Sequence, residues 1–132
     1  MPVLHVNEKL FTLAEARAAL PRVRKLVEAM MESRKRIVVL QPELWPAIEA
    51  AAGNGGVPVA GELIRWSEQL RASFQELTAM GIHVQDVGRG LIDFPALRDG
   101  HEIYLCWMHP EPEIGWWHEM DAGFAGRRPL EA

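Results

Sequence analysis

Residues 91–108, LIDFPALRDGHEIYLCWM, decide the fold of this chain. Asp99-Gly100 divides the stretch into two runs in which apolar residues alternate with other residues, a period that is typical of β-strands. An Asp-Gly pair between two such runs is a strong signal for a two-residue hairpin turn. That turn places residue 98 opposite residue 101, and this register decides which side chains share a face of the sheet.

The flanking sequence extends this hairpin into an antiparallel meander. A five-residue loop at 109–113 sets the register of the last strand and brings Tyr104 opposite His118. The first hairpin turn places Asp93 beside Cys106. The predicted strands, each followed by a turn with glycine or proline, are 82–87, 91–94, 102–108 and 114–120.

The two registers sort the sheet residues into two faces. We expect the apolar first face to pack on helices and form the core. The first face collects Ile92, Phe94, Ile103, Leu105, Trp107 and Trp117. The second face mixes polar and large apolar residues: Asp93, Glu102, Tyr104, Cys106, Met108, Ile114, Trp116, His118 and Met120.

A long helix is predicted before the meander. Thr12 and Glu15 have the spacing of a capping box, and apolar residues then recur at steps of three and four, as in a heptad seam. Pro21 should bend or restart this helix because proline removes a backbone donor. The β-branched run that begins at Ile37 leaves open whether the helix continues past Leu40.

A second helix is predicted after an irregular segment. The period breaks in residues 41–61, where prolines and a glycine cluster at 53–56 leave only a short helical turn at 47–52. The second helix follows over 62–80, with Gly81 as its expected C-terminal cap. Two helices joined by a loop favour an antiparallel hairpin.

The predicted fold is therefore a single α+β domain of 132 residues. Residues 12–80 form a long antiparallel helical hairpin that packs on a small antiparallel β-meander. The meander has three to four strands within residues 82–121, and residues 122–132 form a C-terminal tail.

The composition narrows the class of protein. A formal net charge of −4 argues against a nucleic-acid binder, which normally carries a clustered basic surface. Cys106 is the single cysteine, which excludes an internal disulfide and is typical of a reducing compartment. Neither a signal peptide nor an apolar run of about 18 residues is visible, so we expect a cytoplasmic protein with no membrane partner.

The second face predicts a partner. Its apolar residues form more surface than a monomer normally leaves in water. Either the terminal segments, residues 2–10 and 122–132, fold across this face, or a second copy of the chain covers it. We favour a homodimer whose interface includes Trp116, Met108, Ile114 and Met120.

His118 is the centre of a candidate metal site. Histidine and carboxylate ligands suit zinc, manganese or iron. The other candidate ligands are Glu119, Asp121, Asp93 and Tyr104. In a strand, His118 and Glu119 point to opposite faces, so they share a metal only across a bulge. The favoured alternative is structural: a Tyr104–His118 hydrogen bond, with Glu119 and Asp121 paired to the arginines that follow.

Two further motifs carry weaker signals. Arg127 and Arg128 lie in a glycine-containing tail that could bind an anion, but a turn that places Phe124 in the core is favoured. Cys106 and His109 have the residue types of a nucleophile and its base. Their offset of three residues points them apart in a strand, so Cys106 is interpreted as a small buried hydrophobe.

Three stretches also have the residues of a known family: FTLAEARAALPRVRKLV (11–27), GLIDFPALRDGHEIYLCW (90–107) and IGWWHEMDAGFAGRRPL (114–130). They resemble the bacterial domain-of-unknown-function family 2203. The resemblance implies a pair of long helices followed by GL-DFPA, YLCW and WHE-GF-GR-PL blocks, and it implies no established activity. The matching positions in the sheet blocks are Gly90, Leu91, Asp93, Phe94, Pro95, Ala96, Tyr104 to Trp107, Trp117, His118, Glu119, Gly123, Phe124, Gly126, Arg127, Pro129 and Leu130. The prolines after Leu40 depart from the family pattern, which again leaves the end of the first helix open.

These observations leave two main functions open. The leading hypothesis is a non-catalytic cytosolic domain that self-associates through the second sheet face. The alternative is a divalent-metal-binding protein or metal-dependent hydrolase centred on His118, with an anion binder at the two arginines as a weaker third hypothesis. The sequence does not identify a small-molecule ligand or a substrate.

Overall fold

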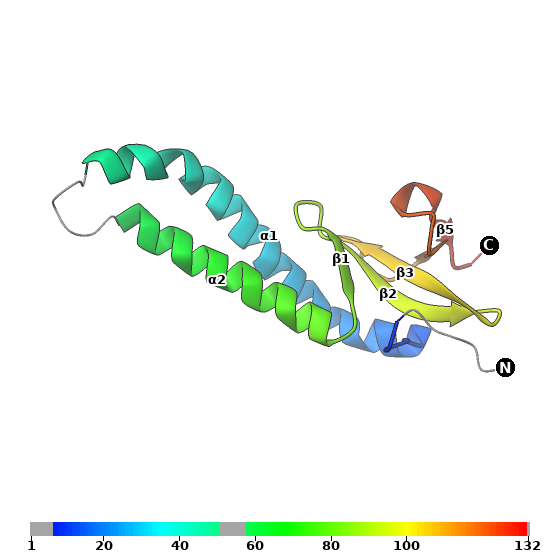
Figure 1. Ribbon diagram of the computed structural model, residues 1–132. Coiled ribbons are helices and arrows are strands. Elements are labelled where there is room, and N and C mark those ends of the chain that lie inside the picture. The colour runs from blue at the N-terminus through cyan, green and yellow to red at the C-terminus, as the bar shows by residue number, and fades with distance from the viewer. Residues whose placement is uncertain (1–6, 51–57, 132) are drawn as a thin grey trace.

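The computed structural model describes residues 7–50 and 58–131 and shows an α+β fold. Two long helices, α1 (Leu13–Ala50) and α2 (Pro58–Ala79), pack side by side as an antiparallel pair (Figure 1). An antiparallel sheet follows in the order β1-β2-β3-β4-β5. Its elements are β1 (His83–Asp86), β2 (Leu91–Arg98), β3 (His101–Met108), β4 (Trp116–Glu119), the short 3-10 helix η1 (Phe124–Gly126) and β5 (Arg128–Pro129). The predicted class is confirmed, with five strands in place of three to four.

The start of α1 follows the predicted capping box. The Glu15 N–H donates to the Thr12 hydroxyl at 3.0 Å, and the Thr12 N–H donates to the Glu15 carboxylate at 2.9 Å. These two bonds satisfy backbone donors that the first turn of a helix leaves without partners. Within the described ranges, neither helix combines the length and the apolar character that a membrane crossing requires.

The middle of the helical region differs from the prediction. The sequence left the end of the first helix open, and in the structure α1 continues past Leu40 to Ala50; Pro21 does not restart the helix. All three prolines of α1, Pro21, Pro42 and Pro46, lie on exposed turns. The carbonyls that they leave unpaired therefore face water, and α1 stays one continuous, curved helix (Figure 1).

The second helix begins earlier than predicted. α2 starts at Pro58, four residues before position 62, because proline is well tolerated in the first turn of a helix. It ends as predicted at Gly81, whose φ of 92° lies in the left-handed region. The Ile82 N–H donates to the Leu77 carbonyl at 3.0 Å, as in a Schellman cap. The predicted helical turn at 47–52 is part of α1 as far as Ala50, and the glycine cluster at 53–56 lies outside the described residues.

Both predicted strand registers are confirmed. Residue pairs Arg98↔His101 and Tyr104↔His118 lie opposite each other. The Asp99-Gly100 turn has a positive φ at both residues, as a type I′ hairpin turn requires. β2 is longer than predicted and includes Pro95, which lies beyond the end of the neighbouring β1. The missing N–H of Pro95 therefore removes no bond to β1.

The core lies between the first sheet face and the base of the helical pair. It contains all six residues that were predicted for the first face and, from α1, residues such as Val23, Val27 and Met30. Trp107 and Phe94 are the largest aromatic side chains that are fully buried there. Only the base of the helical pair lies on the sheet, and the rest projects beyond it (Figure 1).

Two residues lie elsewhere than predicted. Ile114, expected on the second face and in a dimer interface, is fully buried in the core. The reason is that β4 begins only at Trp116, so the preceding loop turns Ile114 toward α1. The heptad spacing of the second predicted helix places Trp66 on a core face. In the structure Trp66 is half-buried on the projecting part of α2, with the Arg36 guanidinium 5.6 Å from its ring centroid.

Candidate functional site

The C-terminal tail covers part of the second sheet face. β5 pairs with β4, and η1 carries Phe124 over the same side of the sheet. The Phe124 ring contacts two guanidinium groups, Arg89 at 4.7 Å and Arg127 at 4.5 Å. Phe124 is half-buried and does not belong to the core, so its predicted place there is wrong. The sequence left open whether the terminal segments or a second copy of the chain cover the second face. In the structure the C-terminal tail covers part of it.

The two tail arginines point to different sides of the sheet. Arg127 pairs through both terminal nitrogens with the Glu111 carboxylate and lies 4.5 Å from the Trp116 ring. Arg128 lies 5.3 Å from the ring of Trp117, the next residue of β4, which faces the opposite side. The structure therefore does not bring Arg127 and Arg128 together around one anion.

Three ligand-type side chains meet on the second face. Asp93 of β2, Cys106 of β3 and His118 of β4 occupy adjacent strands, and we call them the triad. All three are at least 98 % buried, and one ligand atom from each lies within 4.8 Å of the other two. The predicted register places them together because Asp93 lies opposite Cys106 and both share a face with His118. The sequence prediction included Asp93 and His118 but treated Cys106 as inert.

The hydrogen bonds of His118 fix its protonation. Its Nδ1 lies 2.7 Å from the Glu119 carbonyl oxygen, which can only accept, so Nδ1 carries a proton. In a neutral imidazole, Nε2 is then an acceptor, and it faces Asp93 Oδ1 at 3.0 Å. Two acceptors do not bond to each other. The pair therefore requires a positive species between them, which is either a proton or a metal ion.

Burial shapes the acidity of the other two triad members. It raises the pKa of the Asp93 carboxyl, and the neighbouring His118 ring opposes that rise. Burial, followed by the nearby Asp93 charge, raises the pKa of the Cys106 thiol to about 11. At neutral pH the thiol keeps its proton, so it is not a nucleophile by itself. A bound metal would have to displace that proton.

The triad lines a cavity of about 340 Å³ that is open on the second face. The turn between β1 and β2 contributes Arg89 to the lining, and the tail contributes Phe124, whose ring contacts Arg89. Tyr104 also lines the cavity, with its ring centroid 5.5 Å from that of His118. The cavity gives a small molecule access to the buried triad.

The other predicted ligands lie outside the triad. Glu119 points to the opposite face and contacts His101 at 3.1 Å, so the expected pairing with the tail arginines is wrong for this residue. Asp121 is exposed in the turn after β4. Both ring nitrogens of His118 bond elsewhere, so in the described chain the expected Tyr104–His118 hydrogen bond does not form.

A family model described as an uncharacterized conserved protein (DUF2203) matches residues 9–130. The chain belongs to this family. The match runs from just before α1 to just after β5 and includes the whole triad. No curated protein and no solved structure gives a significant match. The family resemblance of the three sequence stretches is thus confirmed.

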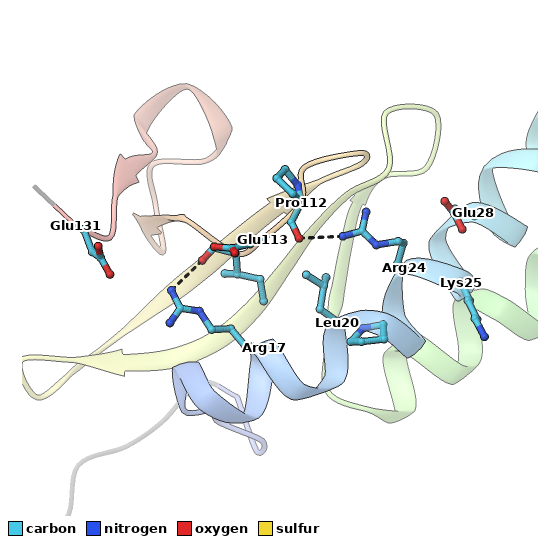
Figure 2. A pocket seen from close by; sticks show the side chains of 10 residues that line it. Arg17, Leu20, Arg24, Lys25, Glu28, Pro112, Glu113 and Glu131 are labelled. Atoms are coloured by element: carbon cyan, nitrogen blue, oxygen red, sulfur yellow. Dashed lines mark hydrogen bonds between the residues drawn. The ribbon is translucent and has the colours of Figure 1, made fainter.

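A larger cavity, of about 710 Å³, lies between α1 and the loop that precedes β4 (Figure 2). Its arginines bond to backbone carbonyls of that loop. Arg24 donates to Pro112 at 3.2 Å and Arg17 to Ile114 at 3.5 Å, as the dashed lines in Figure 2 show. These bonds hold the loop on α1. In the described part of the chain the triad is the one group of three potential metal ligands, so the smaller cavity is the better candidate site.

The predicted separation of Cys106 and His109 is confirmed. His109 contacts Glu28 of α1 at 3.0 Å, whereas Cys106 belongs to the triad. The thiol is fully buried, as predicted for a small hydrophobe. The sequence interpretation did not recognise that Asp93 and His118 surround the Cys106 thiol, although the predicted register already placed Asp93 beside it.

Proposed function

We propose that this DUF2203 protein binds one divalent transition-metal ion through Asp93, Cys106 and His118. The observation that supports the proposal is the convergence of three different ligand atoms within 4.8 Å of one another, in a buried site on a cavity wall. Around a tetrahedral zinc ion, bonds of about 2.0–2.3 Å place ligand atoms about 3.3–3.6 Å apart. To reach that geometry, His118 Nε2 and Asp93 Oδ1, now 3.0 Å apart, would separate slightly, and ligand atoms near the 4.8 Å limit would move closer together.

The ligand types favour zinc among the expected metals. A thiolate beside an imidazole and a carboxylate suits zinc or iron and disfavours manganese, which prefers oxygen ligands. The hydrogen bond from His118 Nδ1 to the Glu119 carbonyl orients Nε2 toward the metal, as in many zinc sites. The charges of an ionised Asp93 and Cys106 balance those of a divalent cation. A guanidinium nitrogen of Arg127, 3.8 Å from Cys106 Sγ, also favours the thiolate.

The number of protein ligands bears on activity. Structural zinc sites are normally closed by four protein ligands, whereas catalytic sites have three and leave one position open. Here three ligands lie on the wall of a cavity, which supports a metal-dependent hydrolase as the class of activity. The structural alternative is that a proton alone joins His118 to Asp93. That alternative does not need the Cys106 thiol.

Elemental analysis of untagged protein purified without chelators tests the metal proposal. We expect about one equivalent of zinc per chain, and at least about tenfold less in Cys106→Ala and in His118→Ala, because each removes a ligand. His101→Ala is the matched control, since His101 also contacts a carboxylate at 3.1 Å but lies exposed outside the triad. A wild-type protein that holds no metal even after incubation with zinc would contradict the proposal.

As a second function we propose self-association, through a surface other than the one first predicted. The projecting arm, residues 35–50 and 58–69, exposes apolar side chains that its own helices do not cover. Val38, Trp45 and Ile48 are between 40 % and 67 % exposed. Their spacing of seven and three residues forms one stripe along α1, as in a helix–helix interface.

The charges of the arm support a second copy of this chain as the partner. Lys35 and its neighbours make the base of the arm basic, whereas Glu43 and Glu49 lie toward its tip. If two arms pack antiparallel about a twofold axis, the basic base of each meets the acidic tip of the other. The second sheet face is a weaker candidate than the arm for the dimer interface, because the tail contacts Trp116 and because Met108 and Met120 are half-buried. A molar mass that rises with protein concentration is the expected result.

A further inference from the structure

We propose that the open metal position binds a small oxyanion, such as the carboxylate of a short organic acid, and that Arg89 binds its second oxygen. This inference rests on the proposed metal site. It names the class of ligand that the cavity beside the triad accepts.

Among the described residues, the Arg89 guanidinium forms no ion pair, and the nearby Asp86 carboxylate bonds to the Arg89 backbone N–H instead. In the described part of the chain its side chain contacts the Phe124 ring at 4.7 Å and the Met108 sulfur at 3.7 Å, and neither group carries a charge. Arg127, the other guanidinium near the triad, is already paired with Glu111. Arg89 is therefore the cation on this cavity wall that remains available to an anion.

Two contacts restrain Arg89, although its side chain is exposed. Its backbone N–H donates to the Asp86 carboxylate at 3.0 Å, which holds the turn between β1 and β2 in shape. The stacking on Phe124 restrains the far end of the side chain. A guanidinium held in this way loses little conformational entropy when it binds a carboxylate through two parallel hydrogen bonds.

The remaining cavity wall limits the ligand to a small molecule with a short apolar part. Besides Arg89 and the triad, the lining includes the acidic residue Asp86, the polar residues Tyr104 and Gln85, and apolar residues such as Leu91 and Met120. A volume of about 340 Å³ holds on the order of ten water-sized groups. A carboxylate that bridges the metal and Arg89 would direct its hydrocarbon chain along the apolar part. Binding replaces a water at the open position and breaks no covalent bond.

The experiment uses cobalt(II) as a coloured substitute for zinc in the full chain. Propionate is titrated into the cobalt-loaded protein, and the visible absorption of the metal reports changes in its coordination. We expect a saturable spectral change with propionate and none with propanol, which lacks the charge. Arg89→Gln should weaken propionate binding by about tenfold to a hundredfold, because one charge-assisted contact is lost. Its cobalt stoichiometry should stay that of the wild type.

Two controls separate the possible failures. Arg98→Gln removes a guanidinium that lies 4.6 Å from the Trp117 ring on the first face, so its affinity for propionate should equal that of the wild type. A wild-type protein that binds no cobalt would contradict the proposed metal site itself. Cobalt binding with no response to propionate, or with an equal response in Arg89→Gln, would overturn the present inference and leave the metal site standing.

Discussion

Cys106 shows how far a single residue can be interpreted from its type. A lone cysteine in an apolar strand is usually a buried hydrophobe, and Cys106 is indeed fully buried. Its chemistry depends on Asp93 and His118, which are distant in sequence and meet it only through the strand register. The register could be predicted from turn residues. The direction of the His118 ring could not, because it depends on a hydrogen bond to the next backbone carbonyl.

The buried thiol predicts a pH dependence of stability. In the folded, metal-free protein its pKa is about 11, against an ordinary value of 9.0, so the folded state binds this proton more tightly than the unfolded state. Stability should therefore fall as the pH rises from about 9 to about 11, by about 2 kcal/mol at pH 10.5. Cys106→Ala should lack this part of the loss. Urea unfolding of both proteins with a chelator, at pH 8 and pH 10.5, measures the difference, and equal losses would contradict the assigned environment.

At the scale of elements, turn and cap residues predicted more than periodicity did. The Asp99-Gly100 turn, the Gly81 cap and the Thr12–Glu15 box all form as expected, because each depends on local backbone geometry. The end of α1 was not predicted, because the cost of a proline depends on whether the freed carbonyl reaches water. β5 was also not predicted, for a different reason. A two-residue strand has no detectable period, and its pairing with β4 depends on tertiary contacts.

The tail predicts a contrast between two adjacent arginines. Arg127→Gln should destabilise the protein by about 2 kcal/mol, because it breaks a bidentate pair with the largely buried Glu111 carboxylate. Arg128→Gln should change stability by no more than about 0.5 kcal/mol, since Arg128 is exposed. Chemical denaturation measures both values. Equal effects at the two positions would show that the Arg127–Glu111 pair does not anchor the tail.

At the scale of the whole molecule, the sequence predicted the fold class and the core residues. It did not predict how much of the helical pair lies on the sheet. A helical seam has the same spacing whether it faces another helix or a sheet, so the pattern did not show that part of the helical pair projects beyond the sheet (Figure 1). Nor could it show what covers the second face. The tail and a second copy would both bury the same residues, and only the tertiary structure places η1 there.

The projecting arm predicts how self-association responds to mutation. Trp45→Asp places a charge in the centre of the apolar stripe and should weaken the dimer by at least about tenfold, as expected for loss of a central aromatic residue. Leu97→Asp is the matched control, because Leu97 is 50 % exposed but lies at the end of β2, away from the arm. Light scattering over a range of concentrations measures both. A monomeric wild type, or equal weakening by the two changes, would contradict an interface on the arm.

The most direct test of the central claim is X-ray absorption spectroscopy of the zinc-loaded protein in solution. The proposed site predicts one sulfur ligand at about 2.3 Å, from Cys106, with nitrogen and oxygen ligands at about 2.0–2.1 Å. In Cys106→Ala the sulfur contribution should disappear. A zinc spectrum with only nitrogen and oxygen ligands in the wild type would place the metal elsewhere. The triad would then be a hydrogen-bonded group of the protein interior, joined by a proton.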